Sequence, residues 1–254
     1  MGKLSGIAGT MRGRVGSLVY SKGENGTTYV RQYQPQVFNP RTPEQLVQRA
    51  KMNLAGQLSS LTSRAIVRAM AVGNNRKCRG VYVNRLLREI TVTTQAGNYV
   101  AKISVPSMTF SRGSAQLHAE ATQIQAGETT ISVELEMNDT ARAGLYGERI
   151  VVVSIVPRTV SEFDFITSAD ILLSDTGTRV VEVNLPHALM SGQKVHVFRC
   201  PYELSDGEAS VIAERLYGVD SDEEAQAVVS SHLAVASSIW GDSSYAGVVT
   251  YSNE

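Results

Sequence analysis

The chain has 254 residues and no net formal charge at pH 7, and its 43% hydrophobic and 19% charged residues exclude fibrous and fully disordered proteins. No run approaches the roughly 18 apolar residues of a membrane-spanning helix, and the polar, glycine-rich start is unlike a signal peptide. We therefore expect a globular protein without membrane contact that stays in the cytoplasm, or is packed into something assembled there.

Charge is divided unevenly along the chain. Residues 1–90 hold 15 Lys and Arg against three acidic residues, a balance of +12, and the remainder holds 9 against 21, a balance of −12. This division suits a polyanion bound by the basic half, or a basic half that docks on the acidic half of a neighbouring copy. Solvated surface charge that happens to segregate is the plainer alternative.

Residues 1–38 form a glycine-rich arm that we expect to contain a β-hairpin. Arg14–Tyr20 and Thr27–Tyr33 are rich in β-branched and aromatic residues, which favours strands, and Lys22–Gly26 supplies turn residues between them. An isolated two-stranded hairpin is only marginally stable. The arm is therefore predicted to pack on its own body or on another chain.

Residues 39–90 are predicted to form two basic helices. Thr42 suits the N-cap, Pro43 the first helical position, and Gln45 completes a capping box. Apolar residues then recur in steps of three and four, which predicts one long helix that ends at Gly73–Asn75. This stripe consists of Leu46, Ala50, Leu54, Leu58, Leu61, Ala65, Ala69 and Val72. A second helix is predicted over Cys78–Ile90, and the basic residues lie largely off both apolar stripes.

Residues 91–254 are predicted to form an acidic antiparallel β-sandwich, with a helical insertion near residues 206–240. Short alternating segments are separated by turn signals such as Ala126–Glu128 and Ser191–Gln193, at a spacing typical of sandwiches. The expected strands are Ala115–Ala121, Thr130–Met137, Arg149–Val156, Ile166–Leu173, Arg179–Leu185, Lys194–Cys200 and Tyr245–Tyr251. The helix of the insertion is placed near Asp222–Ala236. The fold class is therefore α+β.

No catalytic or metal-binding pattern is found. The four histidines lie in different segments without metal-ligand spacing, and we expect His118 and His196 to be half-exposed sheet residues. Nucleophile-elbow, phosphate-loop and dinucleotide-binding motifs are missing. Cys78 and Cys200 lie far apart without C-x-x-C spacing, so both are predicted to be buried thiols. We therefore expect no enzyme activity, cofactor, metal or small-molecule substrate.

Nonspecific DNA contact is a separate alternative. Eleven basic residues from Arg31 to Arg88 supply enough cations for phosphate contacts. Aromatic residues interleaved for stacking, and a compact helix-turn-helix pattern, are missing from that stretch. Any DNA contact is therefore expected to be nonspecific and to involve the DNA phosphate backbone alone.

The N-terminal segment contains a distinctive set of residues: Gly2-Lys3, Gly6, Gly9, Gly13 and Gly16 with Val15, and above all Asn39–Gln45 followed by Gln48–Lys51. In these residues the chain resembles an uncharacterised family found in gut Bacteroidota and their bacteriophages. The resemblance is specific over about the first 70 residues, and Ser243–Val248 is similar to the C-terminal strand of that family. The resemblance implies a glycine-rich β arm, helices and an immunoglobulin-like sandwich, as in ring or neck proteins of crAss-like phage tails.

We therefore expect a non-enzymatic virion protein, a subunit of a tail, neck or connector ring that assembles head-to-tail in the bacterial host cytoplasm with copies of itself and other virion proteins. The alternatives are a bacterial immunoglobulin-like binding module and a nonspecific DNA-binding protein that uses the basic half. The predicted assembly interface comprises Arg12, Arg14, Tyr20, Tyr29, Arg41, Arg64 and Arg68.

Overall fold

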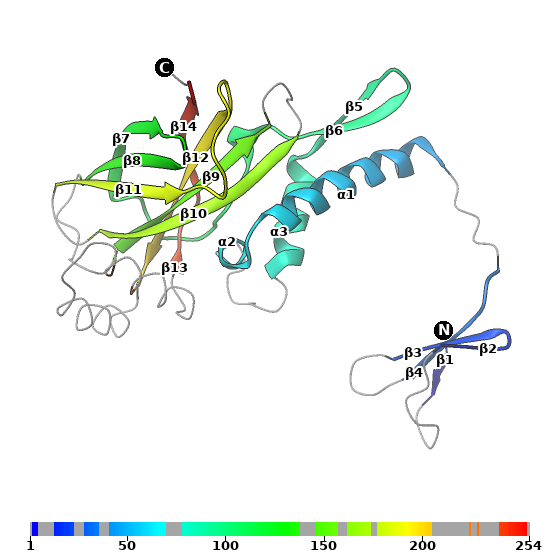
Figure 1. Cartoon of the computed structure of the whole chain (residues 1–254). Coiled ribbons are helices and arrows are strands. Elements are labelled where there is room, and N and C mark those ends of the chain that lie inside the picture. The colour runs from blue at the N-terminus through cyan, green and yellow to red at the C-terminus, as the bar shows by residue number, and fades with distance from the viewer. Residues whose placement is uncertain are drawn as a thin grey trace. The chain divides into compact units, whose positions relative to one another are not determined.

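The computed structural model describes residues 2–4, 13–22, 28–35, 41–69, 78–137, 146–156, 162–173, 177–204, 224, 228 and 239–252 (Figure 1). The chain divides into two units, Met1–Gln45 and Leu46–Glu254. The fold is mixed α+β, with mostly antiparallel strands in several sheets, an N-terminal hairpin and few helices, as the sequence predicted at this level.

The first unit contains a small antiparallel sheet with the strand order β1-β4-β3-β2. Its strands are β1 (Gly2–Leu4), β2 (Gly13–Val15), β3 (Leu18–Lys22) and β4 (Thr28–Gln32). The predicted hairpin is present as β3 and β4, but the single strand expected over Arg14–Tyr20 is wrong. It folds back on itself at Gly16-Ser17, because Gly16 at φ 58° adopts the positive φ that a tight two-residue hairpin turn requires.

The long helix predicted up to Val72 is wrong, because it breaks at Thr62-Ser63 into α1 (Pro43–Leu61) and α2 (Arg64–Arg68). Ser63 has extended backbone, and its hydroxyl accepts a hydrogen bond from the Ile66 amide at 3.4 Å, so a new helix begins there. The second predicted helix is confirmed as α3 (Cys78–Glu89). The end predicted at Gly73–Asn75 lies outside the described residues.

The strands of the second unit form a large and a small sheet. These strands are β7 (Ala119–Ala126), β8 (Thr130–Met137), β9 (Tyr146–Ile155), β10 (Phe163–Leu173), β11 (Thr178–Asn184), β12 (Lys194–Glu203), β13 (Ile239–Trp240) and β14 (Ser244–Thr250). The five-stranded sheet has the order β10-β9-β12-β13, with β14 also paired to β12, and β11-β8-β7 form the three-stranded sheet.

Most of the expected strands are confirmed, and three features differ. The strand expected over Ala115–Ala121 begins later, at Ala119. The sequence missed a separate hairpin, β5 (Thr91–Gln95) and β6 (Asn98–Lys102), and the short 3-10 helix η2 (Val105–Ser107). The insertion expected near residues 206–240 lies almost entirely outside the described residues.

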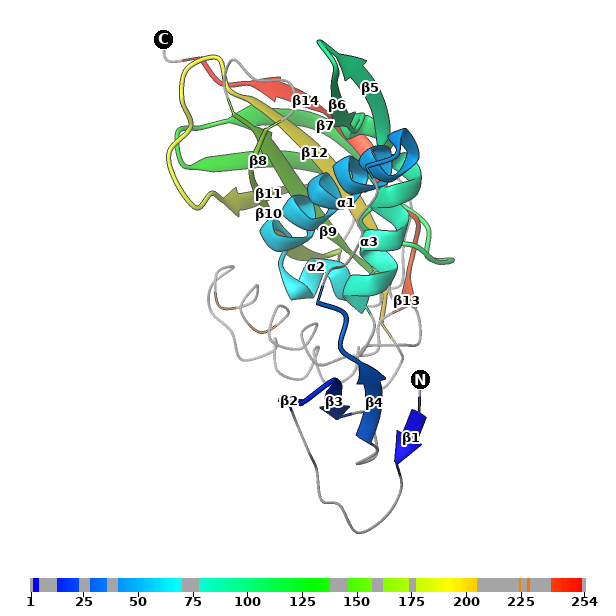
Figure 2. The ribbon, with the colours of Figure 1, turned by 90° about the vertical axis from the view of Figure 1, so that its right-hand side faces the viewer.

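Both faces of the five-stranded sheet are covered. In β9, Val151 and Val153 face the helices, whereas Ile150 and Val152 face the three-stranded sheet, and all four are fully buried. Because a strand covered on both faces needs apolar residues throughout, this strand is a continuous hydrophobic run. Figure 2 shows α1, α2 and α3 against the outer face of the large sheet.

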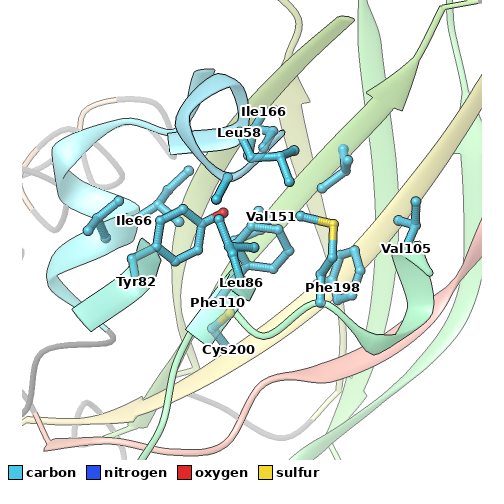
Figure 3. Close-up of a cluster of buried hydrophobic side chains, with 14 of the residues drawn as sticks. Leu58, Ile66, Tyr82, Leu86, Val105, Phe110, Val151, Ile166, Phe198 and Cys200 are labelled. Carbon is cyan, nitrogen blue, oxygen red and sulfur yellow. The ribbon is translucent and has the colours of Figure 1, made fainter. Parts of the chain in front are cut away.

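The predicted helical unit shares its core with the large sheet. Figure 3 shows Leu58 of α1 and Tyr82 and Leu86 of α3 beside Val151 and Phe198 of the sheet. The Tyr82 hydroxyl lies 3.1 Å from the hydroxyl of Thr62, so the polar tip of this buried ring has a partner. The helices and the large sheet therefore share one hydrophobic core.

Candidate assembly interface

The small N-terminal sheet presents two chemically different faces. Arg14, Val19 and Arg31 are register partners across β2, β3 and β4, so their side chains share one face. Tyr29 is two residues before Arg31 on the same strand and lies on that face too. We call Arg14, Val19, Tyr29 and Arg31 the basic face.

Tyr33 extends the basic face beyond the end of β4. The Arg14 guanidinium lies 3.7 Å from the centre of the Tyr33 ring, and its Nε donates to the Gly16 carbonyl at 3.0 Å. A cation stacked on an aromatic ring is held in place without losing its charge. Arg14 is therefore a positioned cation that stays exposed to solvent.

The opposite face of this sheet, here called the apolar face, is mainly apolar and also carries Gln32 and Thr28. Val15 pairs directly with Leu18, and Tyr20 pairs with Val30, so the four side chains lie together. Val15 is 63% exposed and Leu18 38% exposed, while Tyr20 and Val30 are half-buried. Among the side chains described in the first unit, only that of Thr28 is buried, so this part of the sheet has no hydrophobic core.

The structure brings together only some of the predicted interface residues. Arg14 and Tyr29 share the basic face, whereas Tyr20 lies on the apolar face. Arg41 is exposed just before α1. Arg12 lies outside the described residues. The sequence analysis missed four further residues of the two faces, Val15, Leu18, Arg31 and Tyr33. The signal that could have found them is the two-residue loop Gly16-Ser17, because this loop fixes the pairing of β2 with β3.

Arg64 and Arg68 lie four residues apart on α2 and are both exposed. The buried residues of this helix are Ile66 and Val67. The sequence placed Ala65 on the buried stripe by continuing the phase of α1, and this is wrong because Ser63 starts a new helix with a different phase. The expected exposure of both arginines is nevertheless confirmed.

Serine, aspartate and histidine, the residue types of a hydrolytic catalytic triad, come near one another beside β9 and β10. They are Ser154, Asp164 and His187. Nε2 of His187 lies 2.8 Å from Oδ2 of Asp164, and the Gln193 amide donates to the same oxygen at 2.6 Å and to the Ser154 hydroxyl at 2.7 Å. Ser154 is fully buried, and Gln193 stands where a general base would be needed. The geometry is that of a hydrogen-bonded link between strands.

Charged residues inside the second unit are paired. Arg199 binds both carboxylate oxygens of Glu148 and also donates to the Ala119 carbonyl. Burial raises the pKa of Glu148, and the bonds and charge of Arg199 act against this rise. These groups join β9, β12 and the start of β7 in the interior, away from solvent.

The two cysteines are buried and unbonded, as the sequence predicted. Burial raises the pKa of Cys200 to about 12, so its thiolate is scarce at neutral pH. The expectation for His196 is also confirmed, since it is a half-buried residue of β12. His118 is likewise half-buried, but it precedes β7, so its placement in a strand is wrong. In the part of the chain that the structure describes, no three His, Cys, Asp or Glu residues are grouped so that they could hold a metal ion.

Comparison with models of protein families gives no match for this chain, and comparison with curated proteins gives none either. Of the helices in the described ranges, none has the length and apolar character needed to cross a membrane.

Proposed function

We propose that the chain is a non-enzymatic structural subunit that assembles head-to-tail with copies of itself, as a ring in the tail, neck or connector of a bacteriophage virion. The observation that carries the proposal is the small N-terminal sheet, whose apolar face exposes Val15 and Leu18 to solvent. The resemblance of the first 70 residues to phage proteins supports the placement in a virion assembled in the host cytoplasm.

A small sheet needs buried apolar surface to be stable. Burial of apolar surface contributes roughly 25 cal/mol per Å², and the described side chains of this sheet bury little of it within the first unit. A neighbouring subunit that covers the apolar face would supply the missing burial. Because the sheet and the surface that receives it are different parts of the chain, such contacts are heterologous, and they close into a ring where the rotation between subunits permits.

The strand order supports an immunoglobulin-like sandwich as the body of the subunit. The path β10-β9-β12-β14 opposite β11-β8-β7 corresponds to strands C′-C-F-G opposite E-B-A of that architecture. On this proposal residues 1–38 are the arm, residues 39–90 the helices that cover strand C, and residues 91–254 the sandwich.

Size-exclusion chromatography with light scattering tests the proposal. We expect the full chain to form a discrete large oligomer, and a chain that starts at residue 39 to remain folded but monomeric. The second unit keeps both hydrophobic clusters without the arm, so its circular dichroism and melting serve as the control. A monomeric full chain at micromolar concentration, or an intact ring from the shortened chain, would contradict the proposal.

The basic face favours nonspecific nucleic-acid binding as a second candidate function. It combines Arg14 and Arg31 with Tyr29 and Tyr33, and cations beside aromatic rings suit phosphates and stacked bases. Retention on single- and double-stranded DNA at several salt concentrations tests it. If the chain is monomeric and the logarithm of its binding constant for DNA falls linearly with the logarithm of the salt concentration, this candidate is favoured over assembly.

A further inference from the structure

We propose that the basic face of the N-terminal sheet docks on the outer face of the β7-β8-β11 sheet in a second copy of this chain. The inference rests on the proposed function, because it assumes that the chain self-associates. The contact joins two defined surfaces, and their opposite charges fix the orientation of the two copies.

The outer face of the β7-β8-β11 sheet carries four glutamates, Glu120, Glu134, Glu136 and Glu182. Glu136 is the register partner of Glu120, and three of the four side chains are exposed while Glu134 is half-buried. None of the four forms an ion pair within the described part of the chain. We call these residues, with Val180, the acidic face.

Val180 distinguishes the acidic face from an ordinary solvated surface of charged residues. It is the register partner of Glu134 and is 55% exposed, so an apolar side chain stands among the carboxylates. Directly opposed like charges destabilise a sheet, and Glu120 and Glu136 are such a pair. A partner that brings cations and an aromatic ring would relieve the repulsion and cover Val180, and the basic face offers both.

The two faces also match in their spacing. Arg14 and Arg31 lie on strands separated by one intervening strand, about 9–10 Å apart at normal strand spacing. Glu134 and Glu182 lie diagonally on the adjacent strands β8 and β11, about 7–8 Å apart, with Val180 directly opposite Glu134. Two sheet faces can therefore pack with the long arginine side chains over Glu134 and Glu182 and with Tyr29 toward Val180.

Charge reversal in the full chain tests the inference. We expect Arg14→Glu with Arg31→Glu, and separately Glu134→Lys with Glu182→Lys, each to weaken self-association roughly tenfold or more, because both place like charges across the contact. Combining all four substitutions should recover most of the association. A matched control is Glu128→Lys with Glu162→Lys, which changes net charge equally at exposed sites off the acidic face and should leave oligomer size unchanged.

Cross-linking gives a second measurement that does not depend on charge. Chains carrying only Tyr29→Cys are mixed with chains carrying only Val180→Cys and oxidised, and we expect a disulfide-linked dimer of the two because the native thiols are buried. Failure of the wild-type chain to associate would refute the proposed function itself. Association that survives both reversals, or a mixture of the two cysteine variants that forms no disulfide-linked dimer, would refute this contact. Reversal of Arg14 and Arg31 that abolishes DNA retention and leaves oligomer size unchanged would refute it too.

Discussion

Arg149 on β9 and Asp170 on β10 are direct register partners joined by two hydrogen-bonded contacts, Nε to Oδ1 at 2.5 Å and Nη2 to Oδ2 at 2.8 Å. The remaining guanidinium nitrogen donates to the Ala65 carbonyl of α2 at 2.8 Å, and the ring of Trp240 lies 4.8 Å from the guanidinium carbon. Burial lowers the pKa of Arg149, but Asp170 outweighs it and raises the pKa overall. One side chain thus connects the large sheet to the helical layer.

Removing the guanidinium should therefore destabilise the protein strongly. We expect Arg149→Ala to lower the free energy of unfolding by about 3–5 kcal/mol, because it leaves the largely buried Asp170 carboxylate, whose side chain is 10% exposed, without its partner charge. Urea unfolding followed by circular dichroism measures the loss. The double variant Arg149→Ala with Asp170→Ala should recover part of it, and a loss below about 1 kcal/mol in the single variant would contradict the assigned role.

Two glycines should respond to alanine in opposite directions. A Cβ at Gly147 would lie 2.2 Å from Cζ of Tyr202, a fully buried ring whose hydroxyl donates to the Ile171 carbonyl, so we expect Gly147→Ala to cost about 1–3 kcal/mol. A Cβ at Gly56 in α1 meets nothing within 4 Å, so Gly56→Ala should stabilise by about 0.5–1 kcal/mol. Thermal melts of the two variants provide the comparison, and the same sign for both would contradict the packing at Gly147.

The two helix caps should differ in their contribution. Thr42 accepts from the Gln45 amide at 3.4 Å in a fully exposed first turn, so we expect Thr42→Ala to cost about 0.5 kcal/mol. Ser63 caps a helix whose Ile66 and Val67 are buried in the core, so Ser63→Ala should cost about 1–2 kcal/mol. Urea unfolding measures the free energy of unfolding of both variants. If Thr42→Ala and Ser63→Ala lower it equally, the break between α1 and α2 does not depend on the Ser63 hydroxyl.

Acid should destabilise the protein in part through His196. Burial, with the nearby charge of Lys194, lowers the pKa of His196, and its Nδ1 lies 3.0 Å from the Tyr245 hydroxyl. Below the ordinary value of 6.5, the unfolded histidine binds a proton that the folded one does not, so the free energy of unfolding falls as the pH falls toward the lowered pKa. Between pH 7 and pH 5, the free energy of unfolding measured with urea should decline less steeply for His196→Gln than for the wild-type chain. An identical decline in the two proteins would contradict this role of His196.

The sequence alone determined the elements whose signals are local. Thr130–Met137 was expected as a strand and is β8, because alternation of apolar and polar residues needs only one buried face. The helix expected from Cys78 was recovered as α3 for the analogous reason, an apolar stripe at helical spacing. Both patterns depend on side chains a few residues apart.

The tertiary structure alone decided features that depend on contacts between distant segments. The helix break at Ser63 allows Ile66 and Tyr82 to enter one core with Val151, and the helical period by itself cannot reveal this. The basic face arises in the same way, because strand pairing puts Arg14 on the same face as Arg31, 17 positions later in the sequence and one strand away across β3. Residue types and local spacing fix which segments become helices or strands, but register and packing decide which of their side chains meet.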